Sequence, residues 1–298
     1  MNGLEMMILM RGGIQSLKGV FRRIVTWYAP PFLSSNYQTN TPRCDFCYST
    51  VWDTAPLFPR MAPTSPPTTH ARPSYLPILE IQNQNQLNPS SLFGSSSPLI
   101  TIINHLRTLS SALDPANIST LNRLQASTTI YNLEYDILLL NTSNLTQEAI
   151  PLKIAAHLYL WLVIRELPPS SPILDTVIQR LQNSLGEDVM GWWFGNWERK
   201  IWLLWILFVG AVASNGRTER FWFTSELVKF SRLLGVNRIE GPGGLRELLG
   251  SVVLQDIFFE WHLVSVWEDV KLLWDVETVG ERGVDVTFGG ALEDELWS

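Results

Sequence analysis

The residues with the most recognisable spacing for chemistry in this chain are two cysteines, Cys44 and Cys47. A Cys-x-x-Cys pair can supply two of the about four ligands that structural zinc needs, or the dithiol of a thioredoxin-like motif. The 298-residue chain has no second pair, and the nearest histidine, His70, lies in a proline-rich stretch. A redox motif would need an adjacent strand and helix, which proline-rich flanks do not favour. We therefore predict neither a metal site nor a redox site here.

The four histidines do not form a pattern that is typical of catalysis or metal binding. His105 shares a helical face with two threonines, so we expect it to meet solvent. His157 follows Lys153 by one turn in an apolar segment, which favours a core or boundary histidine over a ligand. His262 lies beside an apolar stripe, where a solvated role is expected. No His-Glu-x-x-His motif or Gly-x-Ser-x-Gly elbow occurs.

Two further patterns fall short of a catalytic motif. The run Gly241-Pro-Gly-Gly244 lacks the lysine and the spacing of a phosphate-binding loop, so we predict a turn before a helix at Leu245. Glu268 and Asp269 are adjacent in a predicted helix and point in different directions, so we expect them to complement Lys271. We predict no catalytic, cofactor-binding or metal-ligating residue and no cofactor, and we do not expect an enzyme.

A cluster of tryptophans is the most distinctive feature of the sequence. Core packing is the favoured interpretation, and the alternative is an apolar ligand pocket between helices, as found in helical bundles. The cluster consists of Trp192, Trp193, Trp197, Trp202 and Trp205.

Periodic apolar residues predict that helices position all of these groups. One segment follows the i, i+3, i+4, i+7 pattern through Leu99, Ile102, Ile103, Leu106 and Leu109. Further helices are predicted over 152–164, which is apolar nearly all round as a central buried helix should be, and over 198–213. The last long helix is predicted over 255–275, with an apolar stripe of Phe259, Leu263, Val266, Val270 and Leu273. No series of alternating strands occurs. The sequence therefore predicts an all-α, multi-helix, bundle-like regulatory domain.

Changes in composition divide the chain into four parts. Residues 1–28 are predicted as an N-terminal helical segment, and residues 98–276 as the all-α domain. Between them, 29–97 is rich in Pro, Ser and Gln and is predicted to be a long disordered insertion, because it offers few apolar residues to bury. Residues 277–298 are acidic and are predicted to form a flexible tail.

Charge and hydropathy exclude some classes of function. The net charge of −6 argues against a free-standing nucleic-acid binder, which would carry a basic patch. The start of the chain lacks the features of a signal peptide, so we expect an intracellular protein. The longest apolar run, 201–213, is shorter than the about 20 residues of a membrane-spanning helix. We expect no membrane span, although a membrane-associated helical protein remains an alternative.

Several segments carry a family likeness in a consistent order. Near the start, Met10-Arg-Gly-Gly-Ile-Gln-Ser-Leu17 is followed by Trp27. Further on come His157-Leu-Tyr-Leu160, Arg165-Glu-Leu-Pro168, Trp202-Leu-Leu-Trp-Ile-Leu-Phe-Val-Gly-Ala211, Gly216-Arg-Thr-Glu-Arg-Phe-Trp-Phe223 and Leu234-Gly235. Over roughly 1–28 and 98–276, the chain resembles the C-terminal regulatory region of fungal zinc-cluster (Zn2Cys6-type) transcription factors.

The resemblance implies a nuclear, helical, non-enzymatic region that acts in transcription regulation. It also implies protein partners, namely transcriptional regulators or a homo- or heterodimer, and a response to an effector. The DNA reader of that family uses six cysteines, whereas this chain has two, so we do not expect direct DNA binding. Because the Arg-Gly-Gly segment comes first, we expect a lost front portion or a headless relative. The remaining alternative is a protein that binds a small apolar effector.

Overall fold

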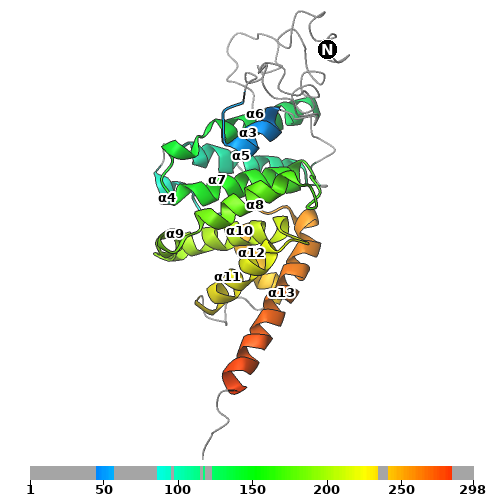
Figure 1. The fold of residues 1–298 in the computed structure, drawn as a ribbon. Helices are drawn as coiled ribbons and strands as arrows, with labels where there is room; N and C mark the ends of the chain where they lie inside the picture. The colour runs from blue at the N-terminus through cyan, green and yellow to red at the C-terminus, as the bar shows by residue number, and fades with distance from the viewer. Residues whose placement is uncertain are drawn as a thin grey trace, which may run out of the picture.

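The computed structural model describes residues 45–56, 86–94, 97–114, 117, 123–233 and 241–283. Within these ranges the chain consists of helices and the turns that join them, with no strand, which confirms the all-α prediction. The predicted helical segment 1–28 lies outside the described residues, as do most of the predicted insertion and residues 284–298 of the predicted tail. The helices are stacked in layers, with α3 and α6 at one end and α11 and α13 at the other (Figure 1).

Two helices occur inside the stretch that was predicted to be disordered. They are α3 (Asp45–Trp52) and α4 (Ser90–Phe93). The α3 segment contains no proline, and its Phe46 is fully buried with its ring 4.8 Å from that of Tyr131 on α6 (Arg123–Leu139). A few well-placed apolar residues therefore order α3, which the average composition of residues 29–97 does not reveal.

Helices α5 (Pro98–Ala112) and α7 (Ala149–Tyr159) form the middle of the stack with α8 (Ile173–Ser184). Proline at the first helical position favours the start of α5, since its missing N–H has no partner there. The apolar stripe predicted from residue 99 to residue 109 is buried. A short 3-10 turn (Thr142–Asn144) leads from α6 towards α7.

Residues 152–164 were predicted to form a central buried helix, and all of them are buried. The helix changes at Leu160 into one turn of π-helix (Leu160–Ile164). The backbone N–H of Arg165 donates to the carbonyl of Leu160 over 3.0 Å, which closes this wider turn. Such single π turns occur frequently at functional sites.

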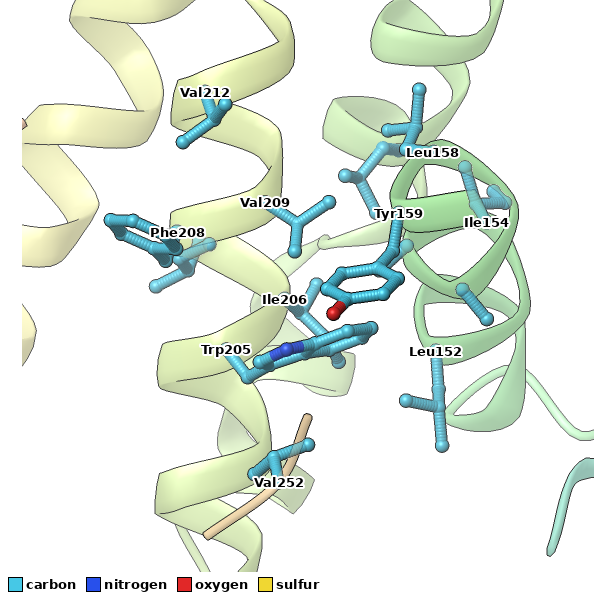
Figure 2. Packing of buried hydrophobic residues seen from close by; sticks show 14 of the residues in the cluster. Leu152, Ile154, Leu158, Tyr159, Trp205, Ile206, Phe208, Val209, Val212 and Val252 are labelled. Carbon is cyan, nitrogen blue, oxygen red and sulfur yellow. The ribbon is translucent and has the colours of Figure 1, made fainter. Parts of the chain in front are cut away.

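Helix α10 (Trp197–Ala213) lies at the centre of the molecule and contacts α7, α8, α9 (Glu187–Trp193), α11, α12 and α13. The side chain of Asn196 caps its start by accepting a hydrogen bond from the Arg199 N–H over 2.8 Å. Residues 201–213 are all buried, as expected for its apolar sequence. In Figure 2, Tyr159 of α7 lies against Trp205 of α10, with ring centroids 5.7 Å apart.

The last three helices are α11 (Glu219–Leu233), α12 (Gly241–Gly250) and α13 (Asp256–Gly283). Gly216, two residues after the cap residue Ser214 of α10, has a φ of +78°, a left-handed conformation that glycine adopts without strain. The run from Gly241 to Gly244 is the first turn of α12, whereas we predicted a turn ahead of a helix at Leu245.

Helix α13 buries Phe259, Leu263, Val266 and Val270 of the predicted apolar stripe, and its last member, Leu273, is half-buried. Its 28 residues give a length of about 42 Å, and its last part extends beyond the stack (Figure 1). The helix continues to Gly283, although the flexible tail was predicted from residue 277. No proline interrupts residues 256–283, so helical geometry can persist there despite the acidic composition.

Candidate functional site

A fully buried carboxylate, Glu134 of α6, forms the centre of an ionic cluster. Its Oε1 accepts a hydrogen bond of 2.7 Å from the indole N–H of Trp161, and its Oε2 pairs with the guanidinium of Arg165. The Nε2 atom of His157 lies 3.9 Å from Oε1, and the rings of His157 and Trp161 are 4.5 Å apart. The cluster therefore joins α6 to α7 and to the π turn that follows α7.

The cluster keeps Glu134 ionised and His157 neutral at pH 7. Burial raises the pKa of the Glu134 carboxyl, but Arg165, His157 and Trp161 outweigh it and hold the pKa below its ordinary value. Burial lowers the pKa of His157, and the nearby Lys153 and Arg165 add to this effect, which Glu134 only partly opposes. The result is a charge-balanced pair, Glu134 and Arg165, with a neutral imidazole beside it.

A pocket of about 340 Å³ lies next to this cluster, between α3, α6, α7 and α8. Two cationic side chains, Lys153 and Arg180, contribute to its wall together with one carboxylate, Asp53. The remaining lining residues are Thr50, Leu138, Thr142, Ile150, Ile154, His157, Val177, Asn183 and Ser184. We call this the α3 pocket.

The end of α3 is attached to both cations of the α3 pocket. The ammonium of Lys153 lies 2.8 Å from Oδ1 of Asp53, and Thr142 donates to Oδ2 of the same carboxylate. Arg180 donates to the carbonyl of Thr50 over 2.5 Å and to that of Val51. Burial raises the pKa of Asp53, but the hydrogen bonds from Lys153 and Thr142 and the nearby positive charges lower it overall. Asp53 is therefore a carboxylate anion at neutral pH.

A second groove, of about 610 Å³, includes one member of the tryptophan cluster. Trp192 stacks on Phe93 with ring centroids 5.7 Å apart, and the Arg199 guanidinium lies 3.9 Å from the centroid of the Trp192 ring. Leu139, which is 53% exposed, also lines this groove. The favoured prediction of core packing is confirmed for Trp193, Trp202 and Trp205, which are fully buried. Trp197 is partly exposed, and Trp192 lines the groove.

A third cavity is lined in part by a half-buried cation, Arg107. Arg107 donates to the carbonyls of Leu87 and Val252, both over 2.7 Å, and thereby ties α5 to two distant loops. Burial lowers the pKa of Arg107 to about 10, so the side chain stays charged at neutral pH. These hydrogen bonds from Arg107 all run to backbone carbonyls, which favours a role in stability.

Four large apolar side chains point outward on α11 and α13. Trp261, Val264 and Leu272 are spaced i, i+3 and i+11 along α13, which places them on one side of that helix. They are 81%, 48% and 66% exposed, and Phe221 of α11 is 66% exposed. A contiguous exposed apolar surface is typical of contact sites, whereas single exposed apolar side chains are common on soluble proteins. We call the three α13 residues, Trp261, Val264 and Leu272, the outer face.

The predictions for individual titratable residues had mixed outcomes. His157 is buried, as predicted, but His105 is also buried, because neighbouring helices cover both sides of α5. His262 is half-buried beside Phe258, with ring centroids 4.7 Å apart. Asp269 was expected to complement Lys271, but it pairs with Arg220 of α11 over 2.6 Å.

The cysteine pair is described only in part. Cys47 lies on α3, and Cys44 is outside the described residues. No group of three or more histidine, cysteine or acidic side chains able to hold a metal occurs in the described part of the chain. The same part contains no helix long and apolar enough to cross a membrane.

Sequence reasoning missed Glu134, Arg165 and Asp53. Lys153 carried a usable signal, because a lysine within an apolar helix needs an anionic partner. That partner, Asp53, is 100 residues away in the chain and lies in a stretch whose composition predicts disorder. Glu134 and Arg165 looked like ordinary polar positions.

Comparison with known proteins agrees with this architecture. Residues 28–241 match the family model described as the fungal-specific transcription factor domain. No curated protein and no solved structure matches the chain. The matched range contains the ionic cluster, the α3 pocket and the central helix α10, and it covers more than two thirds of the 298 residues. The chain therefore belongs to the fungal-specific transcription factor domain family, and its role lies in transcription regulation.

Proposed function

We propose that this chain is a non-enzymatic regulatory module that acts in the nucleus through contacts with other proteins of transcription. It acts without reading DNA by itself. The family match supports the role in transcription. The two cysteines and the net charge of −6 support an indirect mode of action, since a zinc-cluster reader needs six cysteines and a DNA-binding surface needs positive charge.

The observation that carries the proposal of protein contacts is the outer face. Trp261 and Leu272 expose large apolar surfaces on a helix that extends beyond the rest of the stack (Figure 1). Tryptophan contributes strongly to binding where it becomes buried in a partner's pocket. The partner we propose is a transcriptional regulator or a second copy of this chain. A helix with one side packed on the domain and three large apolar side chains exposed among polar residues on the other side fits either.

A tethering experiment tests this function. The chain is fused to a heterologous DNA-binding domain in a fungal host, and expression of a reporter gene with the matching operator is measured. We expect the fusion to change expression relative to the DNA-binding domain alone. The purified chain without the fusion should not shift DNA fragments in a mobility assay. Unchanged reporter expression would contradict the proposal, and so would sequence-specific DNA binding by the chain itself.

A second candidate function is the binding of an apolar effector in the groove that Trp192 lines. The stacked rings of Phe93 and Trp192 and the exposed Leu139 form an apolar surface of the size typical of ligand sites. Titration with brominated fatty acids, which quench tryptophan fluorescence on contact, tests this. Quenching that is reduced by Trp192→Leu would support it, and quenching that Trp192→Leu leaves unchanged would argue against it.

The division of the chain into 1–28, 29–97, 98–276 and 277–298 remains a proposal. Limited proteolysis followed by mass spectrometry tests it. Because α3 packs on α6 and α8, we expect cleavage between 57 and 85 before cleavage within 45–52. Cleavage within α10 at the same rate would contradict this organisation.

A further inference from the structure

The ammonium of Lys153 is deeply buried but has few protein partners. Its side chain is 5% exposed, and among the described residues its only hydrogen bond runs to Asp53. An ammonium has three N–H donors, and a buried charge is costly unless these donors are satisfied. Two donors of Lys153 are therefore available to a group that enters the α3 pocket, whose wall contains this residue.

The α3 pocket carries an excess of one positive charge. Lys153 and Arg180 are its cations, and Asp53 is its one anion. His157 also lines the pocket, but burial lowers its pKa, so it is neutral at pH 7. The neighbouring Glu134 and Arg165 balance each other. A single negative charge entering the pocket would neutralise it.

The rest of the pocket wall combines apolar side chains with a few uncharged polar ones. Leu138, Ile150, Ile154 and Val177 form much of its wall, contributed by α6, α7 and α8. The volume of about 340 Å³ lies near the lower end of the range of about 300–1,000 Å³ typical of small-molecule sites. The walls therefore suit a short aliphatic body attached to the charged group.

We propose that the α3 pocket binds a small aliphatic monocarboxylate. Its carboxylate accepts hydrogen bonds from Lys153 and from the guanidinium of Arg180, and its aliphatic chain packs against Ile154 and Val177. A phosphate dianion fits less well, because its charge exceeds the single positive charge of the pocket and the excess would be partly buried. This proposal does not depend on the role in transcription.

Asp53 is an internal competitor of the ligand. Its carboxylate already holds Lys153 over 2.8 Å, so an incoming carboxylate shares or replaces this contact. This arrangement predicts opposite effects for two substitutions. Lys153→Met removes the cation and should lower the affinity for a carboxylate about tenfold or more, whereas Asp53→Asn frees the cation and should raise it about tenfold.

The experiment is calorimetric titration of the full chain at pH 7 with butyrate, hexanoate and octanoate. The control ligands are inorganic phosphate and hexanamide, which has the aliphatic chain of hexanoate without its negative charge. Lys229→Met is the matched control variant, since Lys229 is a surface lysine with 63% of its side chain exposed. Circular dichroism of each variant shows whether it is folded.

We expect at least one carboxylate to bind, hexanamide and phosphate to bind at least tenfold more weakly, and Lys229→Met to match the wild type. Lys153→Met and Asp53→Asn should shift the affinity in opposite directions. If Lys153→Met does not fold, Asp53→Asn alone decides, because a purely structural Asp53 would not raise affinity when its charge is removed. Absence of carboxylate binding to both wild type and Asp53→Asn overturns the proposal, as does equal binding of hexanamide.

Discussion

The contact between α10 and α11 depends on the absence of a side chain at Gly210. A Cβ atom added there would lie 2.3 Å from Cε1 and 2.6 Å from Cδ1 of Phe223. Carbon atoms in contact normally lie about 3.5–4.0 Å apart, so the ring of Phe223 would have to retreat by about 1 Å. That ring is fully buried and packs edge-to-face on Trp222, with centroids 4.9 Å apart. Burial and this ring contact therefore oppose such a shift.

These distances predict that Gly210→Ala destabilises the domain. Overpacking of a dense core typically costs about 1–3 kcal/mol, while replacing glycine by alanine within a helix contributes about 0.5–1 kcal/mol of stability. We expect a net loss of about 1–2 kcal/mol, or a fall in Tm of about 2–8 °C for a domain of this size.

The assay is urea unfolding followed by far-UV circular dichroism, with Gly191→Ala as the matched control. Gly191 lies in α9, is exposed and has no atom within 4 Å of an added Cβ, so this variant should be as stable as the wild type or slightly more stable. In the double variant Gly210→Ala/Phe223→Leu, the smaller side chain should restore part of the loss. A Gly210→Ala protein as stable as the wild type would refute the close α10–α11 contact.

Three further predictions concern the buried polar groups and α3. Glu134→Ala should lower the free energy of unfolding by about 3–5 kcal/mol, because it leaves Arg165 without its partner. The double variant Glu134→Ala/Arg165→Met should lose less stability than the sum of the two single variants. Additive losses in urea unfolding would contradict the pairing. Stability should fall as pH drops below 6.5, the ordinary pKa of histidine, because folding lowers the pKa of His157 and the unfolded chain therefore binds protons more readily. In thermal unfolding between pH 7.5 and 5.5, the stability of the His157→Gln variant should depend less on pH than that of the wild type. An unchanged pH dependence would contradict the assignment of this effect to His157. Phe46→Ala removes the fully buried aromatic side chain of α3. We expect residues 45–52 to lose protection from amide hydrogen exchange while α10 stays protected. Retained protection of residues 45–52 would show that other contacts order α3.

The helices that carry the core could be predicted because their pattern is local. Residues 201–213 of α10 are apolar nearly all round, and the stripe of α13 follows helical spacing, so each pattern is visible within a few turns. The family likeness rested on segments between residues 157 and 235 and on residues 10–17 with Trp27. The match over residues 28–241 contains the first group and confirms the family.

The candidate site could not be predicted because it depends on contacts between distant residues. Lys153 and Asp53 are separated by 100 positions, and Trp161 and Glu134 by 27. The helical ordering of α3 depends on the packing of Phe46 against Tyr131, a contact that no local sequence pattern reveals. His105 was misjudged for a related reason: its polar neighbours indicated an exposed face, but α6 and α7 pack around α5 and bury that face as well.

The most direct test of the regulatory role compares variants of the outer face in the tethered reporter assay. Trp261→Ser/Leu272→Ser removes two exposed apolar side chains from α13, and Trp52→Ser removes an exposed tryptophan from α3 at the opposite end of the molecule (Figure 1). We predict that the α13 double variant returns reporter expression to the level of the DNA-binding domain alone, at equal protein abundance, while Trp52→Ser behaves like the wild type. Full reporter response from the α13 double variant would contradict the proposal that this face makes the regulatory contact.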